Sequence, residues 1–236
     1  MVTDMSILAV IPARGGSKGI LKKNIYPLNG KPLLLYTIEA LQACNTELFI
    51  TVSTDCKEIM KVARRGGVYV VERPDDISSD TASTESVLLH CLDYIKSKES
   101  RLFDLVLTAQ PTSPFRKAST VDGFISHYLK IHGKYNAQFT LHEDFNDFWI
   151  KIDKNEFKRL HHDAPRRRQE RNPLYVENSC LYITDVKILR ITNNILGSKC
   201  SGYIIDNKEA LDINEMKDLV LAEALLQKCY LPNMHV

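Results

Sequence analysis

A glycine-rich, cationic turn follows the first apolar run of the chain and is the segment best suited to bind an anion. The apolar run covers residues 7–11 and ends at Pro12. Glycines let backbone N–H groups approach an anion and cations neutralise it, so the turn predicts a phosphate-binding loop and a nucleotide ligand. Its spacing matches neither the P-loop nor the dinucleotide-binding fingerprint, and a charged surface turn is the alternative. The glycines and cations are Gly15, Gly16, Gly19, Arg14, Lys18 and Lys23.

Two oxygen-bearing side chains near the end of the chain could hold a hard cation. If residues 211–214 form a strand, Asp212 and Asn214 lie on the same face of it. Such a pair suits Mg²⁺, which binds one or two protein oxygens together with substrate phosphates. The alternative is that Asn214 caps the helix that follows, with Lys217 at the position of the capping-box glutamate. The residues alone leave both interpretations open.

Other polar clusters have simpler explanations. The arginine run 166–168 favours a solvated surface, although one of its members could clamp a carboxylate. The side chains of the adjacent His161 and His162 project in different directions, which favours a surface position over a metal site. Asp55, after an apolar run, favours a local Asx turn over a catalytic role, and Ser83 favours a helix cap.

The first half of the chain alternates strands with helices. Such alternation predicts a parallel sheet with right-handed crossovers, and in such sheets ligands bind beyond the carboxyl ends of the strands. The Gly15 loop, Arg73 and Gln110 are expected at those ends. Residues 138–185 instead hold short β-like pieces, and 214–228 predict a final helix. Strands are predicted at 7–11, 48–53, 68–72 and 105–109, and helices at 32–43, 57–65 and 84–96.

Composition excludes several classes of protein. Of 236 residues, 44% are apolar and 25% charged, as in a globular domain, and a net charge of +2 gives no basic field for nucleic acid. No apolar run approaches the roughly 20 residues that span a bilayer, and the start lacks a signal-peptide pattern, so neither membrane nor nucleic acid is expected as a partner. The six cysteines include no C-x-x-C pair, which favours a reducing, cytoplasmic setting.

Six blocks in one order resemble the acylneuraminate cytidylyltransferases, the CMP-sialic acid synthetases. The opening motif and QPTSPFR are each fairly specific, and the resemblance covers nearly the whole chain. The blocks are IPARGGSKGI with Lys23–Asn24, VSTD at 52–55, ERP at 72–74 with SDTAS at 79–83, QPTSPFR at 110–116, RRQ at 167–169 with Asn178 and Tyr182, and Asp212–Ile213.

The resemblance implies a fold and a reaction. The fold is a single α/β domain over 1–236, with a Rossmann-like, mostly parallel nucleotidyltransferase sheet and helices on both faces. A small β-rich dimerisation and substrate-binding subdomain at about 138–185 reaches into the partner's active site. CTP and a 2-keto-3-deoxy sugar acid give the CMP-sugar and pyrophosphate, with Mg²⁺ or Mn²⁺ as cofactor and a homodimer as the working unit.

The resemblance also assigns roles to residues. Arg14, Lys23 and Asp212 are the expected catalytic residues, and Arg168 is expected to pair with the sugar carboxylate. Whether Asp212 or a metal-bound hydroxide deprotonates the attacking hydroxyl stays open. The nucleotide site comprises Ala13, Arg14, Gly15, Ser17, Lys23, Asn24, Arg73, Ala82 and Thr84; the sugar site comprises Gln110, Trp149, Arg168 and Tyr182; the metal site comprises Asp212 and Asn214.

Three departures from the family pattern bear on the substrate and the metal. Leu21 stands where proline is usual, and Asn214 where aspartate is frequent, which predicts weaker metal binding. Trp149 stands near the position where the family usually has a substrate-binding lysine, and Lys151 follows two residues later. An aromatic side chain there favours a sugar with a more apolar tail, such as legionaminic or pseudaminic acid. The alternatives are a 3-deoxy-manno-octulosonate cytidylyltransferase and a non-catalytic nucleotide-binding relative, which Asn214 alone favours.

Overall fold

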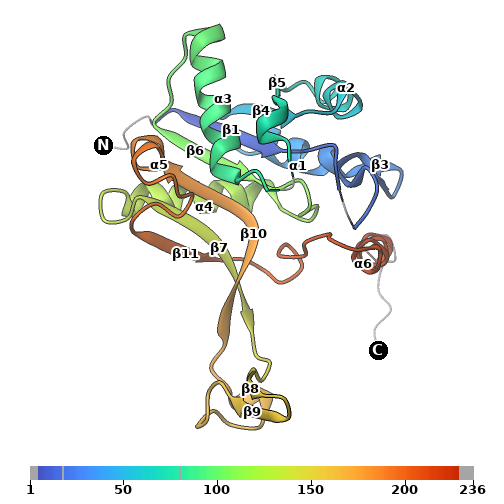
Figure 1. The fold of residues 1–236 in the computed structure, drawn as a ribbon, viewed down its shortest axis with the longest axis vertical. Helices are drawn as coiled ribbons and strands as arrows, with labels where there is room; N and C mark the ends of the chain where they lie inside the picture. Colours follow the sequence, from blue (N-terminus) through green and yellow to red (C-terminus); the bar gives the residue numbers. More distant parts are fainter. Residues whose placement is uncertain (1–4, 18, 80, 229–236) are drawn as a thin grey trace.

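A twisted, mostly parallel sheet forms the centre of the protein. The computed structural model describes residues 5–17, 19–79 and 81–228, and these form a seven-stranded sheet of order β11-β7-β10-β6-β1-β4-β5 (Figure 1). Only β10 runs against the other strands of this described sheet. The strands are β1 Ile7–Pro12, β4 Phe49–Thr54, β5 Tyr69–Glu72, β6 Leu105–Ala109, β7 Ala137–Asp144, β10 Leu174–Asp185 and β11 Cys200–Ile204.

Helices cover both faces of the sheet, because successive side chains of a strand point to opposite faces. Ile7, Ala9 and Ile11 of β1 share one core with α1, α2 and α4, whereas Leu8 and Val10 share the other with α3 and α5. The predicted fold class is therefore confirmed. The helices are α1 Leu33–Gln42, α2 Lys57–Arg65, α3 Thr84–Glu99, α4 Ala118–Ile131, α5 Val186–Thr192 and α6 Met216–Lys228.

A third, smaller core joins the glycine-rich loop to the last helix. Ile20 and Leu28 pack with Ile213, Leu219 and Ala222, so that α6 lies beside the loop that follows β1. A short hairpin of β2 (Pro27–Leu28) and β3 (Lys31–Pro32) and the 3₁₀ turn η1 (Lys23–Ile25) lie between that loop and α1.

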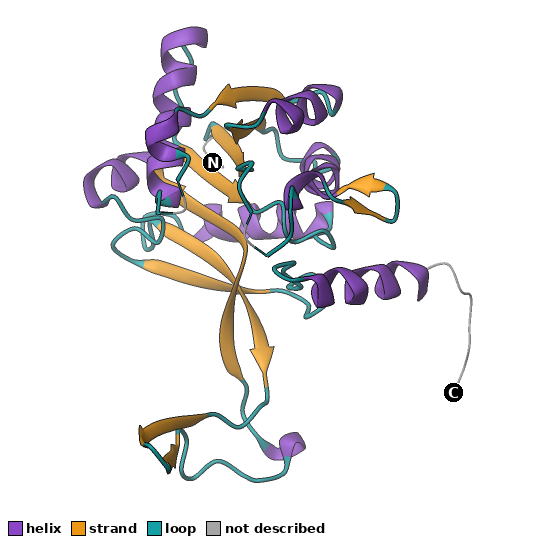
Figure 2. Ribbon diagram, turned by 45° about the vertical axis from the view of Figure 1, so that its right-hand side comes forward, coloured by secondary structure: helices purple, strands orange, loops and turns teal. Residues whose placement is uncertain are grey.

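A long ribbon carries residues 145–173, here called the arm, away from the layered body (Figure 2). The ribbon consists of the outer parts of β7 and β10, and the arm holds β8 (Trp149–Asp153), β9 (Glu156–Arg159) and the turn η3 (Arg168–Glu170). A charged centre organises the arm. Asp147 accepts a hydrogen bond of 2.7 Å from Arg159 and lies 3.4 Å from Arg171. The hydrogen bond from Arg159 lowers the pKa of Asp147.

Several elements differ from the sequence predictions. Helices α4 and α5 and strand β11 were not predicted, and residues 211–214 are irregular chain rather than a strand. In α4 the unfavourable helix residue Gly123 has a packing reason, since a Cβ there would lie 2.6 Å from the hydroxyl of Tyr203. No helix in the described ranges is long and apolar enough to cross a membrane.

Candidate active site

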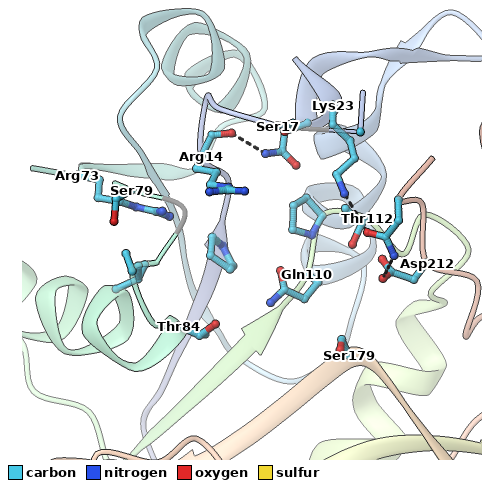
Figure 3. Close-up of a pocket in the computed structure, with 17 residues that line it drawn as sticks. Arg14, Ser17, Lys23, Arg73, Ser79, Thr84, Gln110, Thr112, Ser179 and Asp212 are labelled. Carbon is cyan, nitrogen blue, oxygen red and sulfur yellow. Dashed lines mark hydrogen bonds between the residues drawn. The ribbon is translucent and has the colours of Figure 1, made fainter. Parts of the chain in front are cut away.

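A cavity of about 480 Å³ opens beyond the carboxyl ends of β1, β5 and β6 (Figure 3). This is the edge where a parallel sheet is expected to bind its ligand. Segments from the whole length of the chain meet here, including the predicted loop and the predicted cation site. The lining residues are Pro12, Arg14, Ser17, Gly19, Lys23, Asn24, Arg73, Ser79, Ala82, Thr84, Val87, Gln110, Pro111, Thr112, Ser179, Asp212 and Asn214.

The glycine-rich loop is held by close backbone contacts. The amide of Gly15 donates to the Oδ1 atom of Asp55 at 2.8 Å, and a Cβ on Gly15 would lie 2.8 Å from Cβ of Cys56. A Cβ on Gly19 would overlap the carbonyl oxygen of Asn214. Asp55 thus ties the loop to the end of β4 in place of the expected Asx turn, and the Gly15 amide is already occupied by a protein acceptor.

Asn24 fixes the backbone on the other side of the loop. Its side-chain amide is buried and donates to the carbonyl oxygen of Arg14 at 2.9 Å. Ala13 is fully buried beneath the loop, and its amide donates to the carbonyl oxygen of Ser53. Ala13 and Gly15 therefore shape the loop without lining the cavity, whereas Arg14, Ser17 and Asn24 do line it. Lys18 lies outside the described residues.

One hydrogen-bonded chain in the wall of the cavity joins a cation, an amide and a carboxylate. The Nζ atom of Lys23 donates to the carbonyl oxygen of Ile213 at 2.9 Å and to Oδ1 of Asn214 at 3.1 Å. The Nδ2 atom of Asn214 donates in turn to Oδ2 of Asp212 at 2.7 Å. Burial lowers the pKa of Lys23, and the nearby Asp212 opposes that shift.

The alternative interpretation of Asn214 as the helix cap is not what the structure shows, because its side chain is engaged with Lys23 and Asp212. The cap of α6 comes from Asp218, whose Oδ2 accepts from the backbone amides of Asn214 at 2.9 Å and Glu215 at 2.8 Å. A carboxylate in the first turn of a helix also complements the helix dipole.

The donor set around Asp212 fits a magnesium ion better than a transition metal. The Oδ1 atom of Asp212 is buried and has no hydrogen-bond partner among the described residues. Those residues include no group of three or more His, Cys, Asp or Glu side chains that could hold a metal. One carboxylate and one amide suit Mg²⁺, which takes its remaining oxygens from water and phosphates. In this arrangement the amide oxygen of Asn214 faces Lys23.

Arg73 and the start of α3 form the far wall. The guanidinium of Arg73 donates to Oγ of Ser53 at 3.2 Å and to the carbonyl oxygen of Ser53 at 3.0 Å. Burial lowers the pKa of Arg73, although an arginine remains charged in a protein. Ser83 caps α3 as predicted, by accepting from the amide of Ser86, and so places Thr84 at the cavity.

The QPTSPFR segment contributes one lining side chain and one structural arginine. Gln110 lines the cavity, whereas Arg116 is buried and binds backbone. The Nη2 atom of Arg116 donates to the carbonyl oxygens of Gln110 at 2.9 Å and Cys180 at 2.7 Å. Arg116 thereby fixes the end of β6 against β10.

The four predicted sugar-binding residues occupy three different places. Gln110 lines the cavity, and Tyr182 lies buried in β10, where its hydroxyl donates to Glu177 and lies 3.2 Å from Oγ of Ser179. Trp149 and Arg168 lie on the arm, away from the cavity of the same chain, and Trp149 is 49% exposed (Figure 1).

Some lining residues have only a weak signal in the sequence. Ser79, Val87, Thr112 and Ser179 line the cavity but were not among the predicted site residues. The polar run Glu177-Asn178-Ser179, between the apolar residues Val176 and Cys180 of the strand, is the signal that could have found Ser179.

A family model of cytidylyltransferases matches residues 8–225. The chain belongs to the cytidylyltransferase family. It is 32% identical over 227 residues to the N-acylneuraminate cytidylyltransferase of Escherichia coli O18:K1:H7, in a match that covers 94% of this chain and 52% of the relative. The chain thus spans about half the length of that relative.

A second relative matches over nearly its whole length. The CMP-N,N'-diacetyllegionaminic acid synthase of Legionella pneumophila is 35% identical over 232 residues, which covers 94% of this chain and 97% of the relative. The fold also resembles a solved structure of CMP:2-keto-3-deoxy-manno-octonic acid synthetase complexed with CTP. The TM-score is 0.65 at 14% identity, with 94% of this chain and 99% of that chain covered, and this likeness shows the fold.

The contact between Gly19 and Asn214 generates a stability prediction. We expect Gly19→Ala to lower the melting temperature by about 3 °C or more, because the added methyl group overlaps a backbone carbonyl and forces the loop away from α6. Gly16→Ala is the matched control, since nothing lies within 4 Å of a Cβ there. Thermal unfolding of both variants without ligand measures the difference. Equal melting temperatures would contradict this account of the loop.

Proposed function

We propose that this cytidylyltransferase transfers the cytidylyl group of CTP to a nonulosonic acid and releases pyrophosphate. The observation that carries the proposal is that one cavity collects Arg14, Lys23, Gln110 and Asp212 at the carboxyl edge of the sheet. The names of the two relatives described above, an acylneuraminate cytidylyltransferase and a legionaminic acid CMP synthase, support the substrate class.

The proposed reaction needs positioning and charge neutralisation more than covalent help from the protein. The anomeric hydroxyl of the sugar acid attacks the α-phosphorus, and the bond to the bridging oxygen of pyrophosphate breaks in line. Arg14 and Lys23 hold the phosphates and the charge that develops on them. The ammonium of Lys23 is half-withdrawn from water, where its attraction to a phosphate is stronger.

The cavity offers a separate place for the nucleoside. Arg73 and Thr84 form the wall opposite Lys23 and Asp212, and Ala82 also lines the cavity (Figure 3). We assign the cytidine to that wall and the triphosphate to the space between Arg14 and Lys23. The sugar acid then lies near Gln110, at the end of β6.

Magnesium is the proposed cofactor. Asp212 would hold it through Oδ1, the buried oxygen without a described partner, and Asn214 would join only by turning its amide oxygen from Lys23. When bound, Mg²⁺ would neutralise phosphate charge and align the triphosphate. The residues that would hold it lie beside Lys23, so the cation and the ammonium would share the same phosphates.

A homodimer is proposed to complete the sugar site. The arm exposes several large apolar side chains, which are expected to be covered by another surface. If a second copy covers them, its arm can bring Arg168 to the sugar carboxylate and Trp149 to an apolar sugar tail. The exposed residues of the arm are Phe148, Trp149, Ile150, Ile152, Phe157 and Leu160.

The activity itself is tested by pyrophosphate release from CTP with a panel of sugar acids. We expect release with Mg²⁺ and a legionaminic- or pseudaminic-type acid, with lower kcat/KM for N-acetylneuraminate. Release with 3-deoxy-manno-octulosonate alone would identify the other cytidylyltransferase class. CTP binding without release for any acid would contradict the proposal and favour a non-catalytic relative. A cytoplasmic location remains a prediction of the sequence.

The shared active site is tested by mixing two inactive variants. We expect Lys23→Met and Arg168→Ala each to lose at least about a hundredfold in kcat/KM, since each removes a charge-assisted contact to the substrate. Subunit exchange in an equal mixture should restore about a quarter of wild-type activity, because half of the dimers then hold one intact site. The double variant in one chain is the control and should give no recovery. A mixture as inactive as its components would argue against an arm that serves the partner.

The effect of Asn214 is tested by metal binding. We expect Asn214→Asp to tighten Mn²⁺ binding about tenfold or more, since it sets a second carboxylate beside Asp212. Without metal, repulsion between the two carboxylates should lower the melting temperature, and Mg²⁺ should restore it. Electron paramagnetic resonance of free Mn²⁺ and thermal unfolding measure the two effects. Asp212→Asn is the control that should abolish binding, and unchanged Mn²⁺ affinity in Asn214→Asp would refute the assignment.

A further inference from the structure

Ser179 occupies a left-handed backbone conformation at a break in β10. Its φ is 58°, a value that residues other than glycine seldom adopt. The pairing of β10 with β7 shifts register between Glu177 and Tyr182, so Ser179 lies in a bulge. Strained residues in bulges are frequent at functional sites, where the surrounding structure maintains them.

Both neighbours of Ser179 are held in place by hydrogen bonds. Asn178 is buried, and its Oδ1 accepts from the Oγ1 of Thr140 at 2.6 Å and from the amide of Cys180 at 3.1 Å. The carbonyl oxygen of Cys180 accepts from Arg116 at 2.7 Å. Because these contacts hold the chain on either side, Ser179 is kept in its strained conformation.

The bulge turns Ser179 into the cavity, on the side assigned to the sugar. The amide of Gln110 donates to the carbonyl oxygen of Cys180 at 3.4 Å, which brings the bulge against the end of β6. In the close-up, Ser179 lies below Asp212 and away from Arg73 (Figure 3). Ser179 therefore faces the sugar acid rather than the cytidine.

The hydroxyl of Ser179 has one hydrogen-bond neighbour among the described residues, the hydroxyl of Tyr182. The single hydroxyl proton of Tyr182 is donated to the carboxylate of Glu177, and the hydroxyl oxygen of Tyr182 lies 3.2 Å from the Oγ atom of Ser179. Burial, and then the hydrogen bond to Glu177, raises the pKa of Tyr182, so its hydroxyl keeps the proton that it donates. Among the described residues no other group is hydrogen-bonded to the Ser179 hydroxyl, so a ligand oxygen in the cavity can compete with Tyr182 for the Ser179 proton.

We propose that Ser179 is a specificity-determining residue that donates a hydrogen bond to an oxygen of the sugar acid, and that Tyr182 and Glu177 position it. The inference rests on the proposed function and deepens it. Tyr182, expected to line the sugar pocket itself, acts through Ser179. The strained bulge is the device that presents the hydroxyl to the substrate.

Replacement of Ser179 by glycine removes the backbone strain and the hydroxyl together, and stability and KM report the two effects separately. We expect Ser179→Gly to raise the melting temperature by about 2–4 °C, since glycine adopts this conformation freely. The same variant should raise KM for the sugar acid about tenfold through the lost hydrogen bond and leave KM for CTP within about twofold. Ser100→Gly is the matched control. Ser100 also has a positive φ, 53°, but ends α3 on the surface, so the variant should gain stability with unchanged kinetics.

A double-mutant cycle tests whether Tyr182 acts through Ser179. Tyr182→Phe should raise KM for the sugar acid about threefold in the wild type and have no further effect on Ser179→Gly. Full additivity would show that Tyr182 contacts the sugar directly and would overturn the positioning role. If the wild-type protein is active and Ser179→Gly leaves KM for the sugar acid unchanged, the inference about Ser179 is wrong while the proposed function stands. A wild type that is inactive with every acid contradicts the proposed function itself.

Discussion

The close approach between the glycine-rich loop and the segment before α6 is the constraint on which the site depends. About 190 residues of chain separate the two segments, yet Lys23 donates to Ile213 and Gly19 leaves no room for a side chain beside Asn214. The small core of Ile20, Ile213 and Leu219 holds the contact from behind. Because this contact fixes the position of Lys23 relative to Asp212, the phosphate and metal parts of the proposed mechanism both depend on it.

Polar bridges rather than direct ion pairs set the charge pattern of the cavity. Asn214 lies between Lys23 and Asp212 and forms a hydrogen bond with each through its one amide group. An ammonium and a carboxylate in direct contact would neutralise each other, whereas the amide keeps both charges available to a ligand. The same arrangement leaves one buried oxygen of Asp212 without a described partner, which is the feature that favours a hard cation.

The arm and the cavity divide the proposed site between two parts of the fold. The cavity lies at the carboxyl edge of a sheet that has a packed core on each face. The arm stands apart on a two-stranded ribbon and has a charged centre around Asp147 in place of an apolar core. Its apolar side chains point outward, and this is why a second copy, rather than the same chain, is the proposed recipient of Arg168 and Trp149.

The sequence by itself determined the elements whose signals are local. The apolar run of β1, the apolar stripe of α3 and the glycine-rich turn predicted a phosphate-binding edge of a parallel sheet, and most of the lining residues follow from motifs next to strand ends. These signals suffice because burial on one face or both imposes a fixed periodicity on each strand and helix.

Only the tertiary structure decided the features that depend on partners distant in the chain. Helix α4 tolerates Gly123 because Tyr203 packs onto it, and Asp55 binds Gly15 although 40 residues separate them. Asn214 meets Asp212 without the strand that the pattern suggested, and Ser179 reaches the cavity through a bulge. Each depends on packing or hydrogen bonds between segments that folding alone brings together, and local propensity contains no information about such contacts.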